Sequence, residues 1–222
     1  MDPHSTTPST RRGRLARRGM CLAFAAGVLA LSACGPDQTE EPDDGAGAPP
    51  QEGDGIPAAT AQVQDGDGTE LGTAEFTEVD GGMEVRVDLS ELEPGHHGLH
   101  VHEIGLCEPD SAAPDDPSET GDFLSAGGHL GGEETEHPDH PGDLPSLLVT
   151  EDGTAQMTFV TDRLTAQDLL DEDGSALMVH SDPDNFANIP ERYAPEGPDE
   201  DSTSAGDAGD RSACGVVEAT DA

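Results

Sequence analysis

The chain contains no lysine, and its nine arginines are outnumbered by 48 aspartates and glutamates, so that its formal charge at pH 7 is −39. One acid and five arginines precede Cys34, which leaves 47 acids and four arginines in the rest of the chain, a formal charge of −43. Such a surface repels phosphate backbones and anionic lipid headgroups. The composition argues against nucleic acid as a partner and favours a protein kept soluble in high salt, where repulsion is screened. Compositional drift in a surface that tolerates acids is the alternative.

The apolar run near the N-terminus is too short to span a membrane. It extends from Met20 to Ala33, whereas a spanning helix needs about 20 apolar residues. It follows a basic segment and ends in Leu31-Ser32-Ala33-Cys34-Gly35, a pattern typical of an export signal and similar to a bacterial lipobox. We therefore predict a lipoprotein signal peptide at 1–33 and a lipid on Cys34 that anchors an extracytoplasmic protein to the cell membrane. Secretion after simple cleavage of the signal is the alternative.

The segment after the signal has almost no apolar residues. Residues 34–57 are rich in Pro, Gly, Asp and Glu. Such a composition cannot bury enough apolar surface to offset the entropy of ordering, so we predict a disordered acidic tether. The remaining residues, 58–222, are enough for a single domain with one core.

Short segments of alternating polarity, separated by turn residues, dominate this domain. Asp80-Gly81-Gly82 and Glu151-Asp152-Gly153 lie where tight hairpin turns belong. The expected strands are Ala59–Gln64, Glu70–Glu78, Met83–Leu89, Leu99–Glu103, Leu147–Thr150, Ala155–Val160, Ala176–His180 and Gly215–Ala219. This pattern predicts an all-β sandwich or barrel, with one helical turn at 165–171. The segments 104–146 and 181–213 are too long for simple connections and indicate functional loops.

Two histidines, His100 and His102, stand two residues apart in an expected strand. Because alternate side chains of a strand point to opposite faces, both imidazoles project from the same face. His129 and His180 can join them only through folding. A cluster rich in imidazole suits copper, zinc, iron or nickel, so redox chemistry is possible.

Four features of the chain are distinctive together: Gly98-Leu99-His100-Val101-His102-Glu103, Ser125-Ala126-Gly127-Gly128-His129, His180 at a strand end, and Gly206–Val216. With these features the chain resembles the copper/zinc superoxide dismutase family, in its bacterial form, from about Thr60 to Ala219. The resemblance implies an eight-stranded Greek-key β-barrel, an immunoglobulin-like sandwich, with two long functional loops. It also implies that His100, His102, His129 and His180 bind copper and that His129 bridges copper and zinc.

A zinc site is implied by the same resemblance. Its ligands would be His129, His137, His140 and Asp143, three nitrogens and one carboxylate oxygen, which suit tetrahedral zinc. The loop between His137 and His140 is shorter than in most members and resembles actinobacterial ones. A copper-only enzyme whose short loop does not close around metal is the alternative. Asp184 matches an aspartate that hydrogen-bonds ligands of both metals, a contact that fixes imidazole orientation.

Cysteine is scarce. The signal would remove Cys21 and the lipid would occupy Cys34, which leaves Cys107 and Cys214, an even pair in an exported chain. The resemblance implies that these two form a disulfide. It also implies that Arg211 guides a small anion to the copper, with its planar fork of donors.

The leading interpretation is a superoxide dismutase, in which superoxide is the substrate and copper cycles between two oxidation states. By resemblance, the catalytic residues are Arg211 and His129, whose ring takes up and returns a proton. A copper-binding or copper-buffering lipoprotein without turnover is the alternative, although storage has no use for an anion guide. A structural domain of the envelope with degenerate ligands is a third possibility. The oligomeric state stays open between a monomer and a homodimer.

Overall fold

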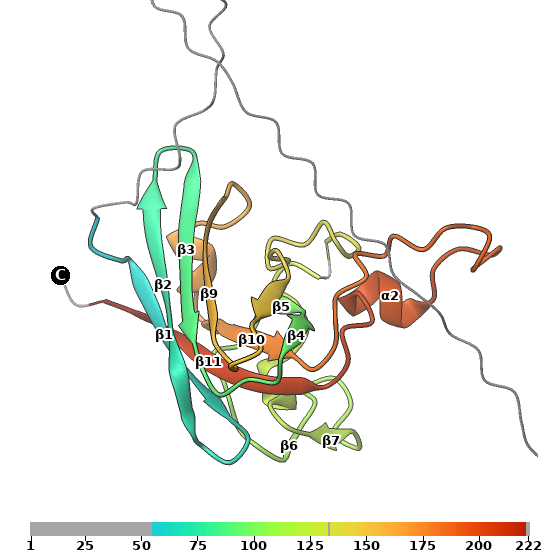
Figure 1. Cartoon of the computed structure of the whole chain (residues 1–222), viewed down its shortest axis with the longest axis horizontal. Coiled ribbons are helices and arrows are strands. Elements are labelled where there is room, and N and C mark those ends of the chain that lie inside the picture. The colour runs from blue at the N-terminus through green and yellow to red at the C-terminus, as the bar shows by residue number, and fades with distance from the viewer. Residues whose placement is uncertain (1–54, 133, 221–222) are drawn as a thin grey trace, which may run out of the picture. The chain divides into compact units, whose positions relative to one another are not determined.

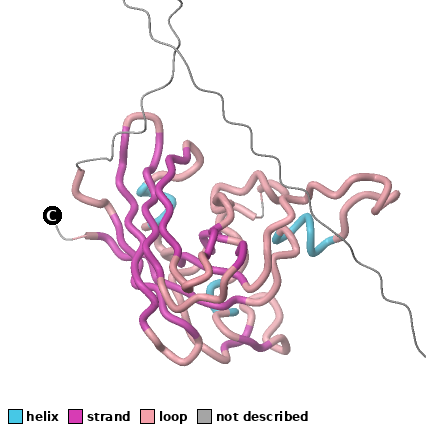
Figure 2. The backbone as a smooth tube through the Cα atoms, viewed as in Figure 1, coloured by secondary structure: helices cyan, strands magenta, loops and turns pink. Residues whose placement is uncertain are grey.

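The computed structural model describes residues 55–132 and 134–220. The predicted signal peptide at 1–33, the lipidated Cys34 and most of the predicted tether lie outside the described residues. In the described part, long antiparallel strands gather on one side and the loops on the other (Figure 2). No helix in this part is long and apolar enough to cross a membrane.

Strands are the main regular elements of the described part of the chain, and nine of them build the barrel (Figure 1). A seven-stranded antiparallel sheet has the order β5-β10-β11-β1-β2-β3-β9, and β4 pairs with β8 separately. These strands are β1 (Ala59–Asp65), β2 (Glu70–Val79), β3 (Gly82–Leu89), β4 (Gly95–His97), β5 (Leu99–His102), β8 (Leu147–Val149), β9 (Ala155–Thr161), β10 (Ala176–His180) and β11 (Arg211–Ala219).

The β4–β8 pair links the two edges of the larger sheet. Only Gly98 separates β4 from β5, and β8 turns into β9 through residues 150–154, where Thr150 N donates to Thr154 O. With β4 and β5 taken as one strand, eight strands form the barrel. The connections at 90–94 and 162–175 cross between strands that are not neighbours, the Greek-key pattern. The predicted fold class is therefore confirmed.

One face of β5 and β10 points into the hydrophobic core, and the other face carries the candidate site. Leu99 and Val101 in β5, with Leu177 and Val179 in β10, point into the barrel, where they are fully buried with residues such as Phe76. Since side chains alternate along a strand, the intervening residues lie on the other face. There His100 is opposite Met178 and His102 is opposite Ala176. The barrel thus holds two histidines in register on its outer face.

The first strand residue of β11 is Arg211, whereas the sequence pattern predicted a start at Gly215. The residues in between are small or polar and have little β-propensity of their own. This segment becomes a strand because it pairs with its neighbours: Arg211 lies opposite His180 in β10, and Ala213 lies opposite Asp65 in β1. This extension places the arginine beside the end of β10.

Short elements occupy the connections. The loop after β5 contains β6 (Ser111–Ala112), β7 (Thr120–Gly121) and the 3-10 turn η1 (Leu124–Ala126), and the loop after β10 contains α2 (Glu200–Ala205). The predicted helical turn is α1 (Ala166–Leu169), which begins at a capping box between Thr165 and Asp168. The two long loops together cover the histidine face of β5 and β10.

A disulfide joins Cys107 to Cys214, with 5.7 Å between their Cα atoms, so the predicted pairing is confirmed. It connects the loop after β5 to β11. Cys214 is fully buried in a small cluster with Phe123 and Met178, on the face of the sheet opposite the main core. The disulfide therefore fixes one functional loop against the barrel.

Replacing both cysteines by serine is expected to lower the free energy of unfolding by about 4 kcal/mol, because the bond closes a loop whose ends are 107 residues apart. Urea unfolding of the metal-free protein measures this. Reductant should shift the wild-type midpoint and leave that of the double variant unchanged. Equal midpoints for the oxidised wild type and the double variant would contradict the expectation.

Candidate metal centre

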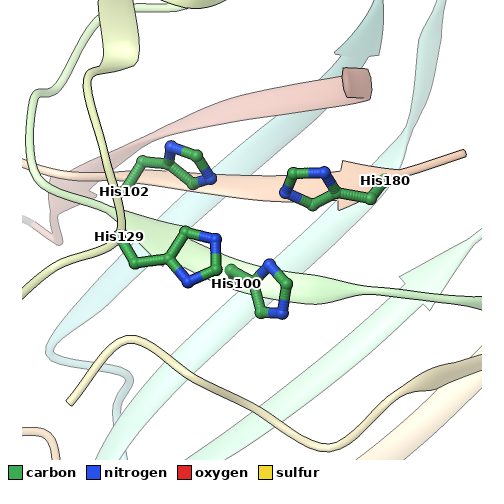
Figure 3. A group of neighbouring side chains, drawn as sticks. All are labelled: His100, His102, His129 and His180. Carbon is green, nitrogen blue, oxygen red and sulfur yellow. The ribbon is translucent and has the colours of Figure 1, made fainter. Parts of the chain in front are cut away.

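Four buried histidines from three parts of the chain meet on the outer face of β5 and β10 (Figure 3). His100 and His102 come from β5 and His180 ends β10. His129 follows η1, and a β-bridge to His102 holds it against the strand. The ring centroids of His129 lie 4.0 Å from His100 and 6.1 Å from His180.

Each of these rings has one buried nitrogen without a hydrogen-bond partner. These atoms are His100 Nδ1, His102 Nε2, His129 Nε2 and His180 Nε2. Donor atoms of the four side chains lie within 4.8 Å of one another. Buried polar atoms normally have partners, and four that converge without one are the arrangement expected around a metal ion.

In the three histidines on β5 and β10, the second ring nitrogen makes a hydrogen bond. His102 Nδ1 donates to Gly127 O at 2.9 Å and His180 Nδ1 donates to Gly209 O at 3.2 Å. His100 Nε2 donates to the Asp184 carboxylate at 2.9 Å. These acceptors set the tautomer and the ring orientation, so that each free nitrogen carries a lone pair toward the centre.

Burial keeps the rings of His102, His129 and His180 neutral. It holds the pKa values of His102 and His180 well below their usual range, and neighbouring histidines add to the effect. Burial also lowers the pKa of His129 to about 4, although Asp143 opposes this shift. Neutral imidazole is the form that binds a metal.

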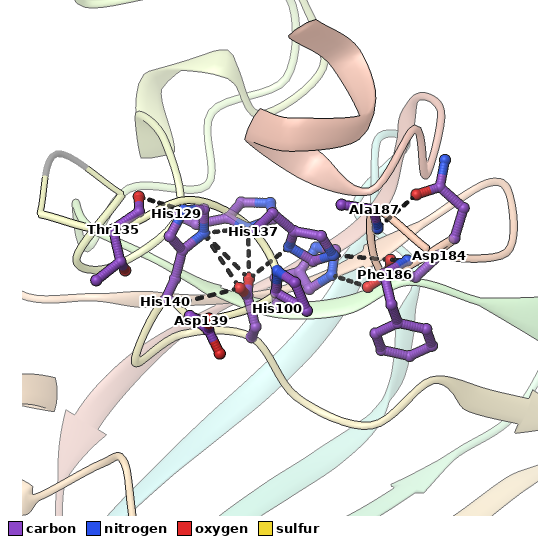
Figure 4. A network of polar contacts seen from close by, with 12 residues as sticks. His100, His129, Thr135, His137, Asp139, His140, Asp184, Phe186 and Ala187 are labelled. Atoms are coloured by element: carbon purple, nitrogen blue, oxygen red, sulfur yellow. Dashed lines mark hydrogen bonds and ion pairs between the residues drawn. The ribbon is translucent and has the colours of Figure 1, made fainter. Parts of the chain in front are cut away.

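A second cluster contains His129, His137 and His140, which lie close together in Figure 4 and all contact Asp143. One of its carboxylate oxygens, Oδ1, lies 2.8 Å from His129 Nδ1, 3.0 Å from His137 Nδ1 and 3.3 Å from His140 Nδ1. His140 Nε2 donates to Thr135 O at 3.0 Å, which turns its Nδ1 toward the cluster. Three nitrogens and a carboxylate oxygen therefore converge, the donor set of a tetrahedral zinc site.

The donor atoms of this second cluster are not all equally close to one another. Donor atoms of His100, His129, His137 and Asp143 lie within 4.8 Å of one another. His140 is attached through its neighbours, with its Nδ1 3.4 Å from His129 Nδ1. His129 belongs to both clusters, since its Nε2 faces the first and its Nδ1 the second.

Asp184 connects the two clusters. Its Oδ2 accepts from His100 Nε2 at 2.9 Å and its Oδ1 accepts from His137 Nε2 at 2.8 Å. Burial opposes ionisation, but the hydrogen bonds from these two rings hold the pKa of Asp184 well below its usual range. Burial likewise lowers the pKa of His137, but Asp143 and Asp184 outweigh it and raise that pKa to about 9.

Gly206 covers the contact between Asp184 and His137. Its φ of +64° is in the left-handed region, and a Cβ added there would lie 2.6 Å from His137 Nε2 and collide with the Asp184 carboxylate. On the outer side, the ring of Phe186 stacks on His137 with 6.3 Å between centroids. The loop after β10 thus encloses the second cluster.

Arg211 lies at the base of a cavity of about 760 Å³ that opens onto His102, His129 and His180. Its guanidinium donates to Phe123 O at 2.6 Å and to Gly127 O at 2.7 Å. Burial lowers its pKa to about 10, which leaves it charged at neutral pH. A fixed cation therefore stands beside the unpartnered nitrogens of the first cluster.

Comparison with known proteins agrees with this geometry. The family model described as copper/zinc superoxide dismutase matches residues 70–217. The chain belongs to the copper/zinc superoxide dismutase family. It is 49% identical over 133 residues to "Superoxide dismutase [Cu-Zn]" of Mycolicibacterium paratuberculosis, a match over 57% of this chain and 57% of that protein.

Other members of the family agree. The protein of the same name from Escherichia coli is 37% identical over 142 residues, which cover 61% of this chain and 72% of that one. The solved Cu/Zn superoxide dismutase from Brucella abortus superposes with a TM-score of 0.56 and 32% identity, over 72% of this chain and 99% of that chain. The matched part spans little more than half the length of the mycobacterial relatives.

The structure brings together every residue that the sequence analysis placed in the site. His96 and His97, which lay outside the motifs, stay outside the clusters: His96 is exposed, and His97 is buried and contacts the carbonyl oxygens of Glu93 and His180. Sequence analysis missed the carbonyl oxygens of Gly127, Gly209 and Thr135, which orient the rings. No residue pattern could reveal them, because any residue type offers a carbonyl.

Proposed function

We propose that the protein is a superoxide dismutase whose copper is held by His100, His102, His129 and His180. The observation that carries this proposal is the convergence of their four unpartnered nitrogens beside Arg211, at the base of an open cavity. Bound copper supplies a one-electron redox change, by which one superoxide is oxidised to dioxygen and a second is reduced to hydrogen peroxide. Superoxide decay with copper-loaded and metal-free protein tests the activity.

Two residues of the chain bind the substrate and transfer a proton. The Arg211 guanidinium attracts the superoxide anion and holds it beside the cluster, since its position is fixed by the Phe123 and Gly127 carbonyl oxygens. His129 holds a proton at Nε2 in one half of the cycle and donates it to the forming peroxide in the other half, and solvent water in the open cavity supplies the second proton that hydrogen peroxide needs. The Nδ1 atom of His129, 2.8 Å from Asp143 Oδ1, belongs to the second cluster, which keeps the ring in place as that proton comes and goes.

The second cluster is proposed to hold zinc through His129, His137, His140 and Asp143. The three Nδ1 atoms around one carboxylate oxygen support this set. Asp184 acts as a positioning residue for both clusters, because it receives one N–H from His100 and one from His137.

Replacing Gly206 by alanine is expected to weaken zinc binding about 10- to 100-fold, the usual cost of disturbing a group that orients a ligand. The added methyl group would push apart Asp184 and His137. Gly197→Ala is the matched control, since Gly197 has φ +96° in the same loop but no atom within 4 Å of an added Cβ. Competition with a chelator measures zinc affinity, and equal affinities for the two variants would refute the role given to Gly206.

We also propose that the mature protein is extracytoplasmic and anchored to the cell membrane by a lipid on Cys34. The proposal rests on the basic segment, the apolar run and Leu31-Ser32-Ala33-Cys34. A disulfide in the domain agrees with an oxidising compartment.

Cys34→Ala is expected to move the protein from the membrane fraction to the soluble fraction, or to leave the signal uncleaved, because the acylated sulfur is lost. Fractionation of cells and mass spectrometry of the mature N-terminus measure this. Cys21→Ala is the control and should leave both results unchanged. A membrane-bound, normally processed Cys34→Ala protein would exclude lipidation at that residue.

A further inference from the structure

The mouth of the cavity above the first cluster is acidic. Five exposed carboxylates line it: Glu119, Asp122, Asp201, Asp207 and Asp210. They come from both long loops, so both loops contribute negative charge to the cavity. The charged group that opposes them among the lining residues is the Arg211 guanidinium, which is half-buried at the base and faces Glu119.

This acidic mouth leads to unpartnered donor atoms. The Nε2 atoms of His102, His129 and His180 lack hydrogen bonds, although these residues are only 1%, 4% and 4% exposed, and all three line the same cavity. A second pocket lies beside Phe159 and Phe186 and contacts none of these three histidines. The acidic mouth therefore gives an open route to the donor atoms in the folded, disulfide-linked domain.

We propose that the five carboxylates form a cation funnel that draws copper ions into the four-histidine site, an inference that rests on the copper ligands proposed above. Clefts lined by charge of one sign raise the association rate of oppositely charged ligands by about 10- to 1,000-fold. The same field repels the anionic substrate, so the mouth favours metal uptake at the expense of substrate encounter. Arg211 acts at short range against that field, and its two carbonyl contacts keep it at the base, away from the rim.

The test measures how fast the metal-free, disulfide-intact protein takes up aqueous Cu²⁺ in a stopped-flow instrument. Absorption from copper bound to imidazole reports the reaction, with the His180→Ala variant as the blank for binding elsewhere. The mouth variant carries Glu119→Gln, Asp122→Asn, Asp201→Asn, Asp207→Asn and Asp210→Asn. The matched control removes the same charge at five exposed acids that do not line the cavity: Glu70→Gln, Glu78→Gln, Asp80→Asn, Glu151→Gln and Glu172→Gln.

At 10 mM salt the mouth variant is expected to take up copper about tenfold more slowly than the wild type, and the control variant within about twofold of it. At 1 M salt, where the Debye length is about 3 Å, the three rates should agree within about twofold. If both variants took up copper equally slowly, the total charge of the protein and not the acidic mouth would set the rate, which would overturn the proposal. Unchanged rates in both variants would show that the carboxylates do not guide copper ions to the site. The final copper content tests the ligands separately, because the mouth variant should still bind one copper per chain.

Discussion

His180→Ala is expected to abolish superoxide dismutation and copper binding together. His180 has its Nε2 among the four converging nitrogens of the first cluster and makes no contact with Asp143 or Asp184. Its loss leaves three donors around a site built for four. Even changes in groups that orient ligands cost 10- to 100-fold, so removal of a ligand should lower the rate constant by at least about a hundredfold.

The variant is measured by pulse radiolysis for activity and by elemental analysis for both metals. Zinc content should stay near that of the wild type, because the second cluster does not include His180. His96→Ala is the matched control, since His96 is an exposed histidine outside both clusters. Wild-type activity with full copper content in His180→Ala would refute the ligand set, and full copper content without any activity in the wild type would indicate a copper store.

Most of the fold follows from local pattern. The alternation in β5 predicted that His100 and His102 share a face, and the structure places Leu99 and Val101 on the opposite face, inside the barrel. Turn signals such as Asp80-Gly81 predicted a tight hairpin turn, and the structure pairs β2 with β3 from Val79 and Gly82 outward. The start of β11 could not be predicted, because residues 211–214 become a strand only through their neighbours.

The identities of the candidate metal ligands could be predicted from the sequence, but the orientation of their side chains could not. Motif resemblance could assign His129 to two metals, but the directions of the His102 and His180 nitrogens depend on backbone carbonyl oxygens from distant loops. The role of Gly206 is equally hidden, since it follows from a close approach of backbone to Asp184. The acidic mouth is a third example, because acids occur throughout the sequence and only folding selects the five that line the cavity.

The charge around that cavity determines how the rate of reaction with superoxide should depend on salt. The chain beyond Cys34 carries a formal charge of −43, and Arg211 is the arginine among the residues that line the cavity. Distant acids repel superoxide, whereas Arg211 attracts it from close range. Salt screens charges beyond about 10 Å at 0.1 M and beyond about 3 Å at 1 M. Added salt should therefore remove repulsion before it removes attraction.

The second-order rate constant of the wild type is thus expected to hold steady or rise as salt increases, opposite to the fall that attractive steering produces. Arg211→Ala should lower the rate constant about tenfold or more at every salt concentration and keep the rise, because the distant acids are unchanged. Arg163→Ala is the control: it removes the same charge from an exposed pair with Asp139, away from this cavity. Pulse radiolysis across a salt series, with rates normalised to copper content, decides between the alternatives. A steep fall for the wild type would mean that local positive potential governs the encounter despite the acidic mouth.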